Sequence, residues 1–235
     1  MNTFFKRASS IFFAIILITS LSSCEATRNA NRAQKGAVIG AAGGALLGGI
    51  LGNNVGKGEN SALGAVVGGV VGGTAGAIIG NSMDKQAQKI EEEIPGAQVE
   101  RIDDGIVVTF DENSGVYFAT NKYNLNDKSQ ETLNKLANVL IEFPDTNILV
   151  VGHTDSTGPR EFNMTLSRDR ANSVTNYFVT QKGISAERIT TEWFGPDAPI
   201  ADNSTVEGRA KNRRVNVAIV PNEKMKEEAK KQAGE

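Results

Sequence analysis

The sequence predicts an α+β fold for the C-terminal half of the chain, a two-layer βαβαβ-type sandwich in which helices cover one face of a sheet. Two observations there predict it. Short segments that are apolar, or that alternate between polar and apolar residues, are typical of strands, and the longer segments between them have apolar residues at helical spacing. Ahead of that half, glycines recur at every fourth residue, and the first residues have the composition of an export signal. A glycine-zipper helical hairpin and a signal peptide are therefore predicted to precede the sandwich.

Residues 1–23 are predicted to be a lipoprotein signal peptide. Lys6 and Arg7 precede an apolar run at Ile11–Ile18, which is too short to span a membrane. The following LSSC, residues 21–24, resembles the processing site of bacterial lipoproteins, where the cysteine is lipidated and becomes the new N-terminus. The alternative is an ordinary secreted protein with a chance cysteine. It is disfavoured because Cys24 is the chain's one cysteine and stands where a lipoprotein requires it.

Lipidation of Cys24 would anchor the chain, since each buried methylene contributes ~0.8 kcal/mol and more than one acyl chain, such as palmitate, makes anchoring stable. Residues 24–35 are then the lipidated N-terminus and a polar tether. Aspartate, which signals retention in the inner membrane of enterobacteria, is absent just after Cys24. The resemblance therefore implies a lipid anchor in the outer membrane, with the C-terminal domain in the periplasm.

Residues 36–80 are predicted to form a glycine-zipper helical hairpin. Glycines recur at every fourth residue from Gly36 to Gly52 and again from Gly64 to Gly80, and the polar segment 53–61 between the runs predicts a turn. Glycine disfavours a helix in water by ~1 kcal/mol relative to alanine. Glycines in phase therefore indicate helices whose backbones approach closely, as small-residue stripes do in membranes.

Three interpretations of this hairpin stay open. Each run would be about 25 Å long at 1.5 Å per residue, slightly shorter than a ~30 Å hydrocarbon core. The hairpin is inserted in the membrane, packed on the bilayer, or used to join copies of the chain into a homo-oligomer. Membrane association is the preferred interpretation, and the segment resembles the glycine zippers of bacterial surface lipoproteins.

The C-terminal half divides into three parts. Residues 81–97 are predicted to be a charged helical connector with solvated faces, residues 98–220 the folded domain, and residues 221–235 a charged tail that is a frayed helix or disordered. Asp104-Gly105 predicts a hairpin turn inside the domain. The predicted elements are strands at Gln98–Asp103 and Ile106–Asp111, a helix at Ser129–Phe143, a central strand at Asn147–Gly152, a helix at Asn163–Lys182, a strand at Ile189–Phe194, a polar loop at Asp197–Glu207 and a closing strand at Arg214–Val220.

The segment at residues 148–178 carries the most informative motif. An apolar strand pattern is followed by a polar loop and by a helix whose apolar positions form one stripe. The loop begins with GHTD at residues 152–155, and the later motif positions are Gly158, Asn163, Leu166, Ser167, Arg170, Ala171 and Val174. Together with GRAKNRRVNVAI at residues 208–219, these positions resemble the OmpA-like peptidoglycan-binding domain, over about residues 98–220.

Arg170 and Asp155 are the leading candidates for a binding site. Arg170 lies on the apolar stripe of its helix, where an unpaired charge would be too costly, and Asp155 at the end of the preceding strand can come close to it. The two residues form either a structural ion pair or a site for a zwitterionic ligand, whose cation meets Asp155 and whose carboxylate meets Arg170.

The resemblance favours the ligand site and implies its ligand. Diaminopimelate of the peptidoglycan stem peptide ends in an ammonium and a carboxylate, and an arginine can bind a carboxylate through a bidentate fork. The resemblance adds contacts at Thr120, Asn121, Thr157, Asn163, Leu166 and Arg213. Asn121 stands where peptidoglycan-associated lipoproteins usually have aspartate. Arg213 is expected to face the pocket and Arg214 the opposite side, because residues alternate along a strand.

Composition disfavours several other functions. A formal net charge of −2 and a pI of about 5.7 give no basic field for nucleic acid. One cysteine excludes an intramolecular disulfide and a Cys-rich metal site. A single histidine disfavours a His-based metal cluster and a Ser-His-Asp triad, and His153 is interpreted as structural. A wall hydrolase would need paired carboxylates or a zinc set, and neither is recognisable.

The sequence therefore predicts a non-catalytic outer-membrane lipoprotein, without cofactor or metal, that binds peptidoglycan and tethers the outer membrane to the cell wall. The alternative is an envelope assembly or scaffolding protein. Its glycine zipper would self-associate or insert in the membrane, and the wall domain would serve as its anchor.

Overall fold

The computed structural model describes residues 73–102, 104–111, 115–119 and 121–235. The predicted signal peptide, the lipidation site Cys24, the tether, most of the glycine-zipper segment and the candidate Thr120 lie outside these residues. Among the described helices, none combines the length and the apolar character needed to cross a membrane.

A five-stranded mixed sheet forms the centre of the domain. Strand β5 lies in its middle, between β2 and β3, so the strand predicted to be central, β3, is second from one edge. Strands β3 and β4 are parallel, and the other pairs are antiparallel. The strands are β1 (Gln98–Ile102), β2 (Gly105–Phe110), β3 (Thr146–His153), β4 (Ile189–Gly195) and β5 (Val215–Pro221), in the spatial order β1-β2-β5-β3-β4.

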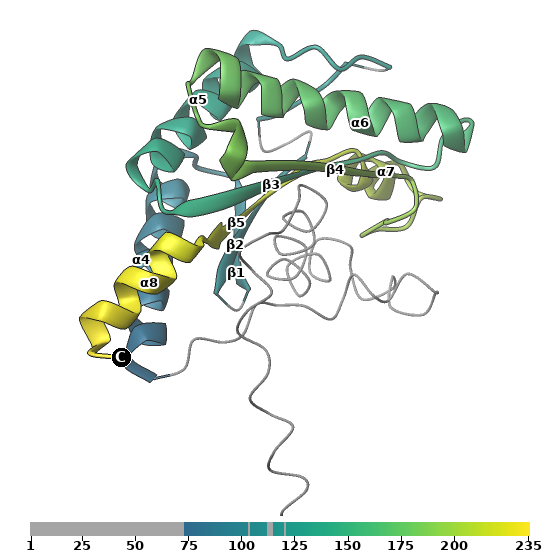
Figure 1. Cartoon of the computed structure of the whole chain (residues 1–235). Coiled ribbons are helices and arrows are strands. Elements are labelled where there is room, and N and C mark those ends of the chain that lie inside the picture. The colour runs from purple at the N-terminus through teal and green to yellow at the C-terminus, as the bar shows by residue number, and fades with distance from the viewer. Residues whose placement is uncertain (1–72, 103, 112–114, 120) are drawn as a thin grey trace, which may run out of the picture. The chain divides into compact units, whose positions relative to one another are not determined.

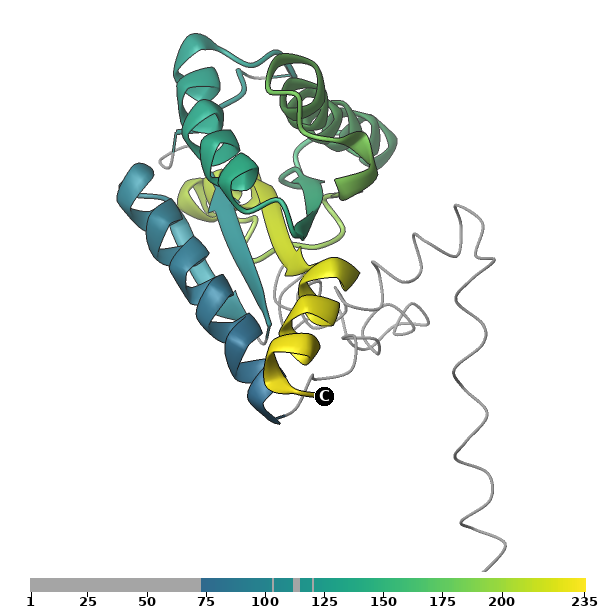
Figure 2. The same ribbon diagram turned by 60° about the vertical axis from the view of Figure 1, so that its left-hand side comes forward.

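Four helices cover one face of this sheet (Figures 1 and 2). Residues Ile148 and Val150 of β3 pack into the main core on the helical side, whereas Leu149 and Val151 belong to a smaller apolar cluster on the other face. This alternation is what a strand in a two-layer sandwich requires. The predicted α+β architecture is thus confirmed. The helices are α4 (Gly73–Glu93), α5 (Asp127–Glu142), α6 (Arg160–Asn176) and α8 (Glu223–Ala233).

Helix α6 does not end as a regular α-helix. Residues Tyr177–Gln181 continue it as a π-helical turn, and Gly183 follows with φ +68°, a left-handed conformation that favours glycine at a helix end. A 3-10 turn at Ala186–Arg188 then leads into β4.

A short helix, α7 (Val206–Asn212), begins inside the segment predicted to be a polar loop. The Thr205 hydroxyl accepts a hydrogen bond from the Gly208 N–H at 3.0 Å and so caps its first turn. Such a short helix has too few residues to display apolar periodicity, so the pattern of the sequence does not indicate it.

Helix α4 is part of the folded domain. It runs through the boundary predicted near residue 80, and one side of it is buried: Ile79, Met83 and Ile90 are 1%, 0% and 0% exposed. The charged residues predicted to be solvated occupy the other side, where Asp84 and Lys85 are exposed. The helix is therefore amphipathic, with its apolar stripe in the main core.

Helix α8 packs along α4 (Figure 2). Its first turn is capped by the Asn222 side chain, which accepts a hydrogen bond from the Met225 N–H at 3.0 Å, and Ala229 is buried. The tail predicted to be frayed or disordered thus forms a packed helix. Its apolar stripe is narrow, with Met225, Ala229 and Ala233 four residues apart, which explains the weak signal in the sequence.

Replacing Ile79 with alanine should lower the free energy of unfolding by about 2–5 kcal/mol, because it removes buried methylenes from the core. Ile141→Ala is the matched control, since Ile141 of α5 is 49% exposed and its loss should cost no more than about 0.5 kcal/mol. Urea unfolding of the full chain measures both. Equal midpoints for the two variants would show that α4 is not part of the cooperative core.

Candidate functional site

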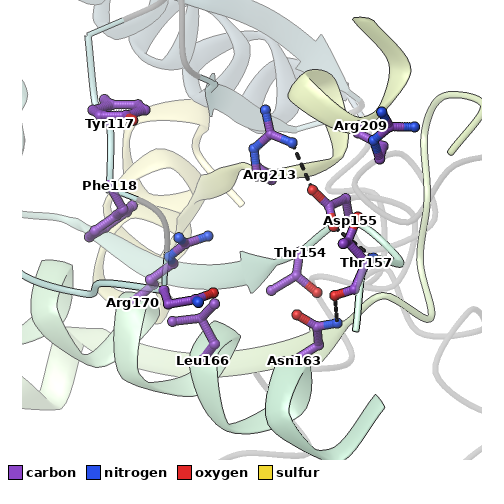
Figure 3. A pocket seen from close by; sticks show the side chains of 11 residues that line it. Tyr117, Phe118, Thr154, Asp155, Thr157, Asn163, Leu166, Arg170, Arg209 and Arg213 are labelled. Carbon is purple, nitrogen blue, oxygen red and sulfur yellow. Dashed lines mark hydrogen bonds and ion pairs between the residues drawn. The ribbon is translucent and has the colours of Figure 1, made fainter. Parts of the chain in front are cut away.

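A pocket of about 410 Å³ lies beyond the C-terminal end of β3 (Figure 3). Four segments meet there: the loop before α5, the loop after β3, α6 from Asn163 to Arg170, and α7 with the residue that follows it. The lining residues are Tyr117, Phe118, Asn121, Thr154, Asp155, Thr157, Asn163, Leu166, Arg170, Arg209 and Arg213.

Asp155 is the acidic residue of this pocket. Arg213 Nη1 lies 2.7 Å from Asp155 Oδ2, and the Thr157 N–H donates to Asp155 Oδ1 at 2.8 Å. Burial by itself would raise the pKa of Asp155, but the hydrogen bonds from Arg213 and Thr157 outweigh it, and the pKa is lowered from its ordinary value. The carboxylate is therefore negatively charged at neutral pH.

Arg170 lies on α6 and is 4% exposed. Its Nε donates to the Lys122 carbonyl oxygen at 3.0 Å and its Nη2 to the Ala119 carbonyl oxygen at 3.4 Å. Its guanidinium carbon also stands 5.1 Å from the centroid of the Phe118 ring, within the range of a cation–π contact. Arg170 thus holds the loop before α5 against α6.

Among the described ion pairs, Asp155 pairs with Arg213 and not with Arg170, so the alternative of a structural ion pair between Asp155 and Arg170 is not what these pairs contain. Both arginines nevertheless line the same pocket (Figure 3). Arg214 points elsewhere: it is 2% exposed, and its Nη2 donates to the Ala198 carbonyl oxygen at 3.1 Å. The expectation that Arg213 rather than Arg214 faces the pocket agrees with this arrangement.

Asn121 belongs to a tight turn at the edge of the pocket. The Lys122 N–H donates to the Ala119 carbonyl oxygen at 2.9 Å, and Asn121 has φ +57°. Asparagine and aspartate are among the few side chains other than glycine that tolerate this left-handed conformation. The exchange of the usual aspartate for Asn121 therefore removes a charge and suits the same backbone.

The start of α6 is tied to the loop after β3. Asn163 Nδ2 donates to the Thr157 carbonyl oxygen at 2.9 Å, and Leu166 lies one turn further along the helix at the pocket wall. Every predicted peptidoglycan-binding residue that the structure describes thus lines this one pocket. Thr120 lies outside the described residues.

Four lining residues were not among the predicted site residues: Tyr117, Phe118, Thr154 and Arg209. Arg209 had a usable signal, because it precedes Arg213 by one helical turn in the closing motif. It lies at the rim, where its Nη1 donates to the carbonyl oxygens of Asn203 and Ser204 at 2.9 and 3.1 Å.

His153 does not take part in the pocket. It is 0% exposed, and its ring is stacked on Phe194 with 5.9 Å between centroids. Burial, and to a lesser extent the charge of Arg214, lower the pKa of His153 well below its ordinary value. It is therefore neutral and structural.

The charges of the lining select the chemistry of a ligand. One carboxylate faces three guanidinium groups, those of Arg170, Arg209 and Arg213, so the pocket carries a net positive charge. Over the described part of the chain, no three His, Cys, Asp or Glu side chains form a group that could hold a metal ion. The arrangement suits an organic ligand that presents a carboxylate together with a cationic group for Asp155.

Two family models match the chain. Residues 117–213, which span the pocket, match the OmpA family, and residues 5–84 match the YMGG-like Gly-zipper.

Similar proteins include two curated relatives and one solved structure. "Probable lipoprotein YiaD" of Escherichia coli is 41% identical over 145 residues, which are 61% of this chain and 65% of the relative. "Peptidoglycan-binding protein ArfA" of Mycobacterium bovis is 43% identical over 89 residues, 38% of this chain and 27% of the relative. The alignment thus spans less than two thirds of each relative.

The solved structure is "the cell wall anchor of the T6SS from Pseudomonas aeruginosa". It superposes with a TM-score of 0.51 at 28% identity and covers 59% of this chain and 96% of that chain.

Gly152→Ala should destabilise the domain and distort the pocket. An added Cβ would lie 2.1 Å from the Ser167 carbonyl oxygen, so α6 would have to move away from β3 and carry Asn163 and Arg170 with it. Overpacking of this kind typically costs about 1–3 kcal/mol, which urea unfolding of the full chain measures.

Gly80→Ala is the matched control, because nothing lies within 4 Å of a Cβ at that helical position. Its stability should stay the same or rise by up to about 1 kcal/mol. Wild-type stability of Gly152→Ala would contradict the close approach of β3 and α6.

Proposed function

We propose that this chain, whose residues 117–213 match the OmpA family and whose residues 5–84 match the YMGG-like Gly-zipper, is a non-catalytic outer-membrane lipoprotein that binds peptidoglycan. It tethers the outer membrane to the cell wall. Its lipid anchor is Cys24, and its C-terminal domain lies in the periplasm.

The ligand is diaminopimelate of the stem peptide. Asp155 receives the ammonium of the ligand and Arg170 its carboxylate, with Thr157, Asn163, Leu166 and Arg213 around them. The observation that carries this proposal is the presence of an oriented, negatively charged Asp155 and the Arg170 guanidinium in one pocket. A zwitterion with a charge of each sign matches that pair, and charge-assisted hydrogen bonds are the strong ones.

The comparisons support each half of the proposal. One relative is named a peptidoglycan-binding protein and another a probable lipoprotein, and the similar solved structure is a cell wall anchor.

A second function is favoured by the Gly-zipper match at residues 5–84. In this alternative the protein is an envelope assembly or scaffolding protein, whose zipper self-associates or inserts in the membrane while the wall domain serves as its anchor. Small-residue stripes allow such close helix packing. The two functions are compatible, because they use different parts of the chain.

Arg170→Ala in the full chain should weaken binding to sacculi that contain diaminopimelate. The loss should be on the order of 10- to 100-fold, since a hydrogen bond to a charged group contributes about 1.5–3 kcal/mol. Arg170→Lys should recover only part of the affinity, because lysine keeps the charge but not the bidentate fork. Co-sedimentation with sacculi measures the affinities, and circular dichroism checks that each variant is folded.

The control is Arg160→Ala on the first turn of α6. Arg160 is exposed and pairs with Asp197, and it does not line the pocket. It should bind sacculi as the wild type does. A folded Arg170→Ala variant that binds equally well would refute the assignment of the site.

A further inference from the structure

A second hollow lies on the other side of the loop that Arg170 holds. Two adjoining cavities of about 440 and 230 Å³ are both lined by Tyr123, Ser173 and Asn176, so they form one groove between the loop before α5 and the C-terminal half of α6. None of the residues lining this groove lines the pocket around Asp155. The groove is therefore a separate site.

The lining of the groove is polar but almost uncharged. It contains five amide side chains, four hydroxyl-bearing side chains and a single charged residue, Asp169, which lines only the smaller cavity. Amides and hydroxyls both donate and accept hydrogen bonds, so they suit a neutral ligand rich in hydroxyl and acetamido groups. This chemistry contrasts with the three guanidinium groups of the pocket.

Two tyrosine rings complete the groove. Tyr123 is 50% exposed, so its ring is accessible to a ligand. The Tyr177 hydroxyl donates to Asn134 Oδ1, 2.8 Å away, which fixes the orientation of its ring. The exposed Tyr123 ring offers an apolar face to a ligand, as the C–H face of a pyranose sugar requires, whereas the Tyr177 ring has the Lys182 ammonium 5.7 Å from its centroid.

The backbone at the groove is also unusual. The π-helical turn Tyr177–Gln181 supplies Tyr177, Thr180 and Gln181 to the lining. Isolated π turns are rare and occur frequently at functional sites. Phe178, in the same turn, is 0% exposed, so the turn is anchored in the core and its polar residues are directed by packing.

The pocket and the groove share one loop, which runs beside α6 (Figure 1). Asn121 lines the pocket and Tyr123 lines the groove, while the Lys122 carbonyl between them accepts from Arg170 at 3.0 Å. In peptidoglycan, charged peptides hang from a neutral sugar chain. A wall fragment with its peptide in the pocket would therefore carry its sugars near this loop.

We infer that the groove binds the glycan strand of the wall, a polymer of N-acetylated amino sugars, as a second subsite beside the peptide pocket. This inference rests on the proposed function, because it assumes that peptidoglycan is the ligand. The groove would therefore add contacts to the glycan strand, the part of the wall that stays the same when the composition of the stem peptide differs.

The test uses the full chain with two probes: glycan strands freed of peptides by an amidase, and a soluble stem peptide that contains diaminopimelate. The wild type should bind both. Tyr123→Ala and Asn176→Ala should each bind the glycan strands roughly three- to tenfold more weakly, as expected for loss of one aromatic or comparable polar contact. Both should bind the stem peptide as the wild type does, since neither residue lines the pocket.

Phe162→Ala is the matched control, because Phe162 of α6 is 46% exposed and lines neither the pocket nor the groove. It should bind both probes normally. Binding of the stem peptide without binding of the glycan strands would refute the assignment of the groove as a glycan site and leave the proposed function intact. Equal glycan binding by Tyr123→Ala and the wild type would also refute that assignment. Failure to bind the stem peptide would count against the proposed function instead.

Discussion

Charged side chains that are almost removed from solvent need partners, and this requirement organises the site of this protein. Asp155 is 8% exposed and Arg170 4% exposed, and each is held by groups distant in the sequence. Arg213, which follows α7, pairs with Asp155, and the loop before α5 receives the hydrogen bonds of Arg170. The pocket is therefore assembled by tertiary structure before any ligand arrives, which reduces the ordering cost of binding.

The pair between Asp155 and Arg213 changes how the site is understood. A carboxylate offers about four lone-pair positions, so Asp155 can keep Arg213 and Thr157 and still accept an ammonium group. Arg213 thus orients the acid and keeps it charged, while Arg170 and Arg209 leave the pocket positive as a whole. A ligand with more negative than positive charge, such as a stem peptide with several carboxylates, fits this balance better than a simple cation.

The sequence was informative where a residue pattern reports directly on structure. The apolar run of β3, the stripe of α6 and the glycine at the close contact, Gly152, predict the layers and bring the motif residues to one pocket. Arg213 faces the pocket for another reason than the predicted strand alternation, because it ends α7 and β5 begins only at Val215. The choice of Arg213 as the partner of Asp155 is a tertiary event that no local pattern reports. The packing of helix α8 was not predicted for a related reason: its narrow stripe becomes apolar surface only when α4 lies beside it.

The most direct test of the central claim is competition for sacculus binding by the full chain, with soluble diaminopimelate and Nα-acetyl-lysine amide as competitors. The blocked lysine keeps a side-chain ammonium for Asp155, but only diaminopimelate pairs an ammonium with a carboxylate that Arg170 can bind. If the site binds both charges, diaminopimelate releases the protein from sacculi and the blocked lysine at the same concentration does not. Equal release by both, or release by neither, would contradict this assignment.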